Sequence, residues 1–67
     1  MDEHYAQIAR DKIEKSIAEL VGAEDYLIKA DAPIWLIESV RRIMSGLCNR
    51  QRNISNQIIY QRKHKAG

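Results

Sequence analysis

Residues 37–61 read IESVRRIMSGLCNRQRNISNQIIYQ and hold the most regular hydrophobic pattern of this 67-residue chain. Positions that share one helix stripe recur there at alternating spacings of three and four residues: Ile37, Val40, Met44, Leu47, Gln51, Ile54, Ile58 and Gln61. Such spacing is typical of the heptad seam between helices that pack side by side. The two glutamines weaken a seam of this kind but can fix its register or its number of partners. We therefore predict a long helix over about residues 33–61.

The N-terminal half carries a second helical pattern. Its apolar positions mostly lie three or four residues apart: Tyr5, Ile8, Ala9, Ile13, Ile17, Leu20, Val21, Leu27 and Ile28. This periodicity predicts a helix over about residues 3–29. Gly22 lies inside it, and a glycine in mid-helix costs about 1 kcal/mol relative to alanine. A break near Gly22, which would give a folded-back monomer of three helices, is the structural alternative.

The segment between the two patterns reads Lys29-Ala30-Asp31-Ala32-Pro33 and contains the single proline of the chain. Proline disfavours a helical residue before it and is tolerated in the first turn of a new helix. We expect Asp31 to cap that new helix, because its carboxylate can accept backbone N–H groups of the first turn. A turn as short as residues 30–32 makes the two helices antiparallel neighbours.

The fold expected for residues 1–67 is thus a single all-α domain, a helical hairpin followed by a basic tail over residues 62–67. At the open end we expect Tyr5 and Ile8 to contact Ile54 and Ile58, and beside the turn Leu27 and Ile28 to contact Ile34 and Ile37. A lone hairpin exposes the outer side of its apolar stripe, so we expect two copies to dimerise into a four-helix bundle. The residues expected to form its core and dimer seam are Ile37, Val40, Met44, Leu47, Ile54 and Ile58.

Charge is divided unevenly along the chain. Residues 1–31 contain eight acids and four bases, whereas residues 32–67 contain seven bases and the single acid Glu38. Either the two halves neutralise each other, within one chain or across a dimer, or the basic half binds an anionic partner. Arg41 lies one helical turn after Glu38, so we expect these two side chains to pair.

Residues 48–57 are rich in arginine, asparagine and glutamine, side chains that contact phosphates and base edges in nucleic-acid complexes. The candidate nucleic-acid contacts on the second helix and tail are Arg42, Asn49, Arg50, Arg52, Asn53, Asn56, Arg62, Lys63 and Lys65. The alternative is that these residues form an ordinary solvated helix surface. The sequence shows no helix-turn-helix pattern, which would require a short helix pair before a recognition helix.

Three large residues lie off the seam of the second helix, namely Trp35, Ile59 and Tyr60. In one interpretation they are covered by the hairpin turn and by the second copy of a dimer. In the other they are exposed anchors for a different protein, because tryptophan and tyrosine are common hot spots of interfaces.

The sequence contains no residue set typical of an enzyme. Cys48 has no histidine or acid near it in sequence, so we expect it to act as a small apolar residue at the edge of the seam. His4 and His64, at the two chain ends, are a weak indication of a metal site. We therefore predict no catalytic activity, cofactor or metal. One cysteine excludes a disulfide framework, and an acidic N-terminus without an apolar run argues against a secretory signal, so we expect a cytoplasmic protein.

These observations favour a small non-enzymatic protein that regulates or binds another protein as a helical homodimer. Its size would suit an accessory protein of a phage or plasmid. The alternative function is a small nucleic-acid-binding regulatory module that uses the basic second helix and tail. No membrane partner is expected, since the longest apolar run is far below the roughly 20 residues of a membrane span.

Overall fold

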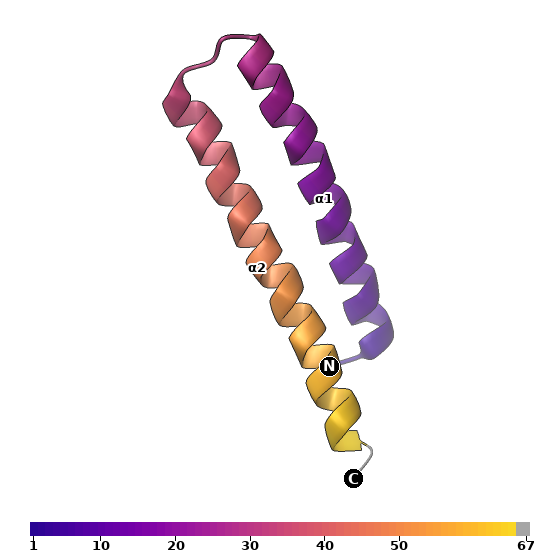
Figure 1. Cartoon of the computed structure of the whole chain (residues 1–67). Helices are drawn as coiled ribbons and strands as arrows, with labels where there is room; N and C mark the ends of the chain where they lie inside the picture. The colour runs from indigo at the N-terminus through magenta and orange to yellow at the C-terminus, as the bar shows by residue number, and fades with distance from the viewer. Residues whose placement is uncertain (66–67) are drawn as a thin grey trace.

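The computed structural model describes residues 1–65, and these form two long antiparallel helices joined by a short turn (Figure 1). Helix α1 is Glu3–Lys29 and helix α2 is Ile34–Lys65. No strand occurs among the described residues. The prediction of an all-α helical hairpin is confirmed, and α1 has the bounds that the hydrophobic periodicity indicated.

Helix α1 begins at a local cap and continues without a break to the turn. The backbone N–H of Tyr5 donates to Oδ1 of Asp2 at 3.1 Å, and Glu3 places an acid in the first turn, where the helix dipole is positive. Gly22 is helical, so the three-helix alternative with a break at this residue is wrong. A Cβ atom added at Gly22 would meet nothing within 4 Å.

Replacing Gly22 with alanine is therefore expected to stabilise the protein by about 1 kcal/mol, because alanine loses less backbone entropy in a helix. Urea denaturation followed by circular dichroism would measure the gain. Gly46→Ala is the matched control, since its Cβ would lie 3.3 Å from Nη1 of Arg50, and we expect it to gain less. A Gly22→Ala protein that is no more stable than the wild type would contradict this expectation.

The turn between the helices depends on a left-handed residue. Asp31 has a φ of 57°. Its N–H donates to the Ile28 carbonyl at 3.1 Å, and the N–H of Ala32 donates to the Leu27 carbonyl at 3.0 Å. These two bonds form the Schellman motif that closes many helices.

The expectation that Asp31 caps α2 is wrong, because this residue completes the end of α1 instead. The first turn of α2 is closed by Pro33, whose carbonyl accepts the N–H of Leu36 at 3.0 Å. A connection this short must reverse the chain within a few residues, which requires a positive φ. Aspartate is one of the few residues other than glycine that tolerates such a conformation.

Asp31→Gly should stabilise the hairpin by about 1 kcal/mol, because glycine adopts the left-handed region without a Cβ penalty. Asp31→Val should destabilise it, since a β-branched side chain is strained at positive φ. Chemical denaturation of both variants, with Asp31→Asn to separate the effect of charge, would test the role of the turn. Equal stability of the glycine and valine variants would refute it.

The two helices face each other along one stripe each. On α2 all eight positions of the predicted seam are buried or half-buried. On α1 the stripe that follows the same spacing of three and four is also buried or half-buried: Glu3, Ala6, Arg10, Ile13, Ile17, Leu20, Glu24 and Leu27. Among the residues whose burial is described, only Ala6 and Ile58 are fully buried, with 6% and 3% of their surface exposed.

The expected contacts at the two ends of the hairpin are partly wrong. Tyr5 is 69% exposed and Ile8 is also exposed, because Ala6 rather than either of them continues the stripe of Ile13. Beside the turn, Leu27 and Ile37 are half-buried as expected. Ile28 and Ile34 are exposed, because neither belongs to the stripe that faces the other helix. Each lies beside that stripe on the helix surface.

The C-terminal end of α2 also differs from expectation. The helix continues through Arg62 and Lys63 to Lys65, so the predicted basic tail is helical over residues 62–65, and its remaining residues 66–67 lie outside the described part. Two contacts support this extension. Arg62 pairs with Glu3 of α1, and the rings of Tyr60 and His64, one turn apart, lie 4.0 Å from each other.

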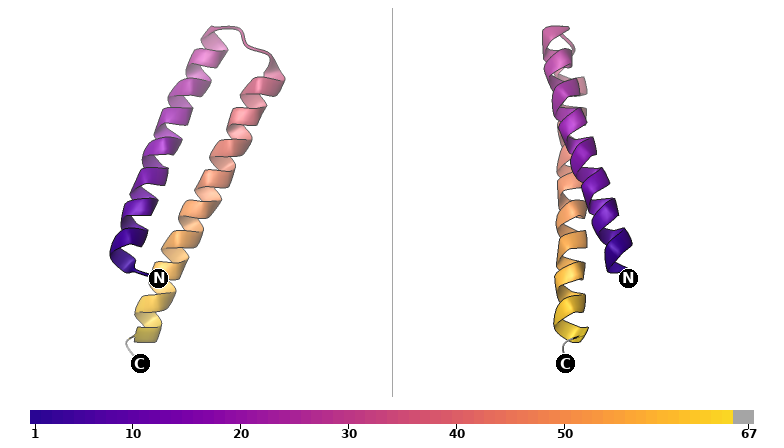
Figure 2. Two further views of the ribbon diagram at one scale, coloured as in Figure 1. Left: turned by 180° about the vertical axis from the view of Figure 1, so that it is seen from behind. Right: turned by 90° about the vertical axis from the view of Figure 1, so that its right-hand side faces the viewer.

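The hairpin is a thin rod with a small core. Its extents are 55 × 17 × 12 Å and its radius of gyration is 15.8 Å, whereas a compact chain of this length would have about 11 Å. Figure 2 shows the helices side by side in one view and nearly one behind the other in the view turned by 90°. In the described part of the chain, neither helix is long and apolar enough to span a membrane.

Candidate functional site

Among the side chains that the structure describes, two ion pairs join α2 to α1. Nε of Arg41 donates to Oε1 of Glu24 at 2.9 Å, and Nε of Arg62 donates to Oε1 of Glu3. The Glu24 side chain is only 18% exposed, so the first pair is partly shielded from water. The expectation that Arg41 pairs with Glu38 is wrong, because Arg41 bonds instead to the acid that faces it on α1.

Glu3 and Glu24 were not predicted as partners of these arginines, although both continue the three-and-four spacing of Ile13, Ile17 and Leu20. A stripe defined by its apolar residues alone omits acids that occupy seam positions. Part of the basic charge of the second half is thus neutralised by the acidic first half. Arg41 and Arg62 belong to this internal pairing.

The outer surface of α2 carries the remaining candidate nucleic-acid contacts. Six exposed residues of α2 lie on one strip of its surface. With a rotation of about 100° per residue, the strip covers an arc of about 100° around the helix axis. Its members are Arg42, Asn49, Arg52, Asn53, Asn56 and Lys63. We call this strip the outer basic face. It extends about 32 Å along the helix and contains no acid.

Three of the nine candidates are not assigned to this strip. Arg50 lies to one side and donates through Nη1 to the carbonyl of Gly46 at 3.2 Å. Arg62 is bound to Glu3 across the hairpin. The side chain of Lys65 lies outside the described residues.

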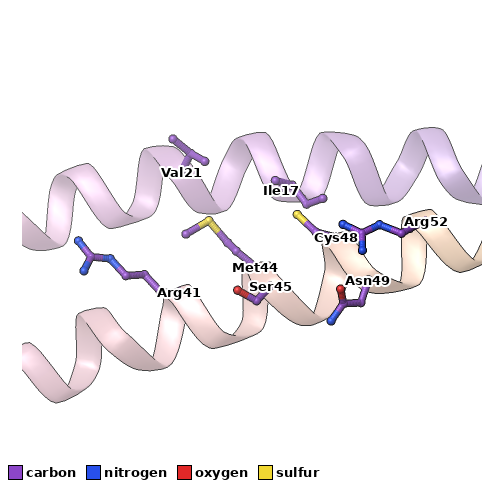
Figure 3. A pocket seen from close by; sticks show the side chains of 8 residues that line it. All are labelled: Ile17, Val21, Arg41, Met44, Ser45, Cys48, Asn49 and Arg52. Carbon is purple, nitrogen blue, oxygen red and sulfur yellow. The ribbon is translucent and has the colours of Figure 1, made fainter.

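An open groove follows the line between the helices (Figure 3). Ile17 and Val21 of α1 and Met44 of α2 are its apolar lining residues, and Arg41 and Arg52 lie toward its two ends. Ser45, Cys48 and Asn49 complete the lining. The Cys48 side chain reaches toward α1 at the groove and is exposed to solvent in the single hairpin. The lining contains no acid or histidine that could act as a proton acceptor beside this thiol.

The three candidate anchors are exposed in the hairpin. Trp35 is 67%, Ile59 51% and Tyr60 57% exposed. Trp35 lies beside the turn and Tyr60 near the opposite end, so the hairpin places them far apart. The turn therefore does not cover Trp35, so this half of the first interpretation is wrong.

The histidines do not form a metal-binding cluster in the part of the chain that the structure describes. No group of three or more histidine, cysteine, aspartate or glutamate residues there has the arrangement to hold a metal ion. The ring of His4 lies against Tyr5, and that of His64 against Tyr60.

Comparison with known proteins found no match among family models, curated proteins or solved structures.

Proposed function

We propose that this chain is a non-enzymatic interaction or regulatory protein that acts as a homodimer of hairpins. The observation that carries the proposal is the surface left by the single hairpin. It exposes 5352 Å², whereas a compact monomer of 7.8 kDa is expected to expose about 4,400 Å². Of the residues whose burial is described, eleven large hydrophobic ones are exposed, including Trp35 and Tyr60. A chain with so little buried core gains most of its stability from a partner.

Trp35 and Tyr60 are the residues through which such a dimer would bind another protein. Both lie on the outer surface of α2, away from the seam that faces α1, so they stay accessible when α1 is in place. Their large rings bury much apolar area at a small entropic cost, which is why such residues dominate interface energies.

The test is affinity capture from host lysate with the full chain and with Trp35→Ala and Tyr60→Ala. We expect a protein that is retained by the wild type and lost with at least one of the two variants. Nuclease treatment separates direct protein contacts from contacts through nucleic acid, and Tyr26→Ala, an exposed tyrosine on α1, is the matched control. Capture that depends on none of these residues would contradict the role of the anchors.

Nucleic-acid binding is the second candidate function, and the outer basic face is the observation that favours it. Arg42, Arg52 and Lys63 lie on this face, and asparagines between them could contact phosphates or bases. Glu38 lies one turn before Arg42 on the same side of α2, whereas Arg52 and Lys63 are far from it. Three cations spread over about 32 Å form a weak electrostatic site. We rank this function below protein binding for that reason.

If these three residues contact phosphates, affinity for duplex DNA or RNA should fall about 40-fold between 50 and 200 mM salt, the slope expected for three neutralised charges. Each of Arg42→Gln, Arg52→Gln and Lys63→Gln should lower the salt slope by about one. Arg41→Gln is the control, because Arg41 is already paired with Glu24. A gel shift that shows no complex at about 50 mM salt and tens of micromolar protein would exclude this function.

A further inference from the structure

We propose that a second copy of this chain covers the groove, with the two hairpin turns at the same end and α1 of each copy against α2 of the other. This inference rests on the proposed homodimer and adds to it the surface that is used and the orientation of the two copies.

The side of the hairpin that carries the groove is apolar near the turn. Val21 lines the groove and is 50% exposed, and Ile28, two helical turns further along the same strip of α1, is 51% exposed. On α2 the facing strip contains Ile34, which is 73% exposed. We call this side the groove face, and it consists of two strips: Glu14, Ile17, Val21, Asp25 and Ile28 on α1, and Ile34, Arg41, Cys48, Arg52 and Ile59 on α2.

The opposite side of the hairpin is a poorer candidate. Ile43 is exposed there to a similar extent as Val21, at 55%, and Tyr5 on the facing strip of α1 is 69% exposed. Tyr5 lies at the end far from the turn, and the rest of that strip consists of the small residues Ala9, Ser16 and Ala23. Arg50 adds a charge on the same side of α2. This side therefore offers less apolar surface to a second copy than the groove face does.

The area available matches what a stable dimer needs. Each hairpin exposes about 1,000 Å² more than a compact monomer of its mass, so burying this excess on two copies removes about 2,000 Å². Specific, stable interfaces bury about 1,200–2,000 Å² in total. The groove face runs along both helices and can supply a surface of this size.

Charge complementarity determines the orientation. The ion pairs of Glu24 with Arg41 and of Glu3 with Arg62 set the register of the hairpin. In this register Asp25 lies level with Arg41, and Glu14 lies level with Arg52. When two copies meet with their turns at the same end, each α1 lies on the partner's α2 at these same levels, so the two acids face the two arginines.

The same orientation also brings the apolar residues together. Val21, Ile28 and Ile34 all lie in the half of the groove face next to the turn, so they gather at one end of the dimer only when the two turns are adjacent. Ile28 of each copy then lies within about one helical turn of the level of the partner's Ile34. With the turns at opposite ends, α1 would lie on α1 and α2 on α2. Val21 would then meet the level of the partner's Asp11, and Ile34 would meet the level of the partner's His64.

The first experiment tests the face and uses sedimentation equilibrium of the full chain at about 10 µM. We expect the wild type and Ile43→Glu to be dimers and Val21→Glu to be a monomer. The two variants are matched, because each adds one acid at a similarly exposed apolar position on opposite sides of the hairpin. Loss of the dimer in Ile43→Glu but not in Val21→Glu would overturn the choice of face, whereas a monomeric wild type would overturn the homodimer itself.

The second experiment tests the orientation by pulsed electron paramagnetic resonance. A spin label is placed beside the turn in the double variant Lys29→Cys and Cys48→Ser. We expect a distance between labels below about 25 Å, since helices in a bundle lie 8–10 Å apart. A distance near 40 Å, about the length of α1, would show the turns at opposite ends and would overturn the orientation while leaving the dimer intact. Lys29 is exposed and lies outside the groove face. Cys48→Ser is the one change on that face, so sedimentation of this single variant is the control that the dimer is retained.

Discussion

Leu47→Glu is expected to unfold the protein at micromolar concentration. Leu47 lies in the middle of the α2 seam and is half-buried against α1 in a hairpin that has only two fully buried residues among those described. The substitution removes apolar contacts and places a carboxylate in the seam, which together cost about 3 kcal/mol or more. A small domain has about 5 kcal/mol of stability or less to lose.

Circular dichroism at 222 nm measures this effect, and we expect more than half of the helical signal to be lost. Asn53→Glu is the control, because it adds the same charge on the exposed outer basic face and away from the groove. That variant should keep its helical signal. A Leu47→Glu protein that melts within a few degrees of the wild type would show that the seam contributes little.

The second large effect is a dependence of thermal stability on protein concentration. If folding and dimerisation are coupled, raising the concentration 100-fold should raise the melting temperature by about 10 °C, the shift expected for a dimer of this total length. The measurement is thermal denaturation at about 1 and 100 µM chain. Cys48→Ser is measured in parallel, so that a disulfide between copies cannot produce the shift. A melting temperature that is independent of concentration in both proteins would argue for a stable monomer.

The fold was largely predictable from local patterns. Alternating spacings of three and four identified the seam of α2 and the extent of α1, because each side chain's place on a helix follows from its position in sequence. Pro33 and the short segment before it indicated where the chain reverses. These features require no knowledge of the partner helix.

The wrong predictions concern residues whose sequence neighbours allow more than one role. Asp31 is suitable both for an N-cap and for a left-handed C-terminal position, and the geometry of the reversal selected the second. Arg41 is close in sequence to Glu38, yet Glu24 on α1 is its partner. Helix α2 extends to Lys65, and the ion pair of Arg62 with Glu3, at the other end of the sequence, supports this extension.

The candidate site shows the same division. The composition of residues 48–57 alone indicated a basic, amide-rich strip on the outside of α2, and the structure leaves that strip exposed. Among the described residues, the register between the helices decides which arginines pair with an acid of α1 and which stay unpaired on this strip. The same register brings Ile17, Val21 and Met44 together in the groove. Sequence periodicity determines the face on which a side chain lies, whereas the antiparallel register, set by cross-helix ion pairs and seam packing, determines which side chain it meets.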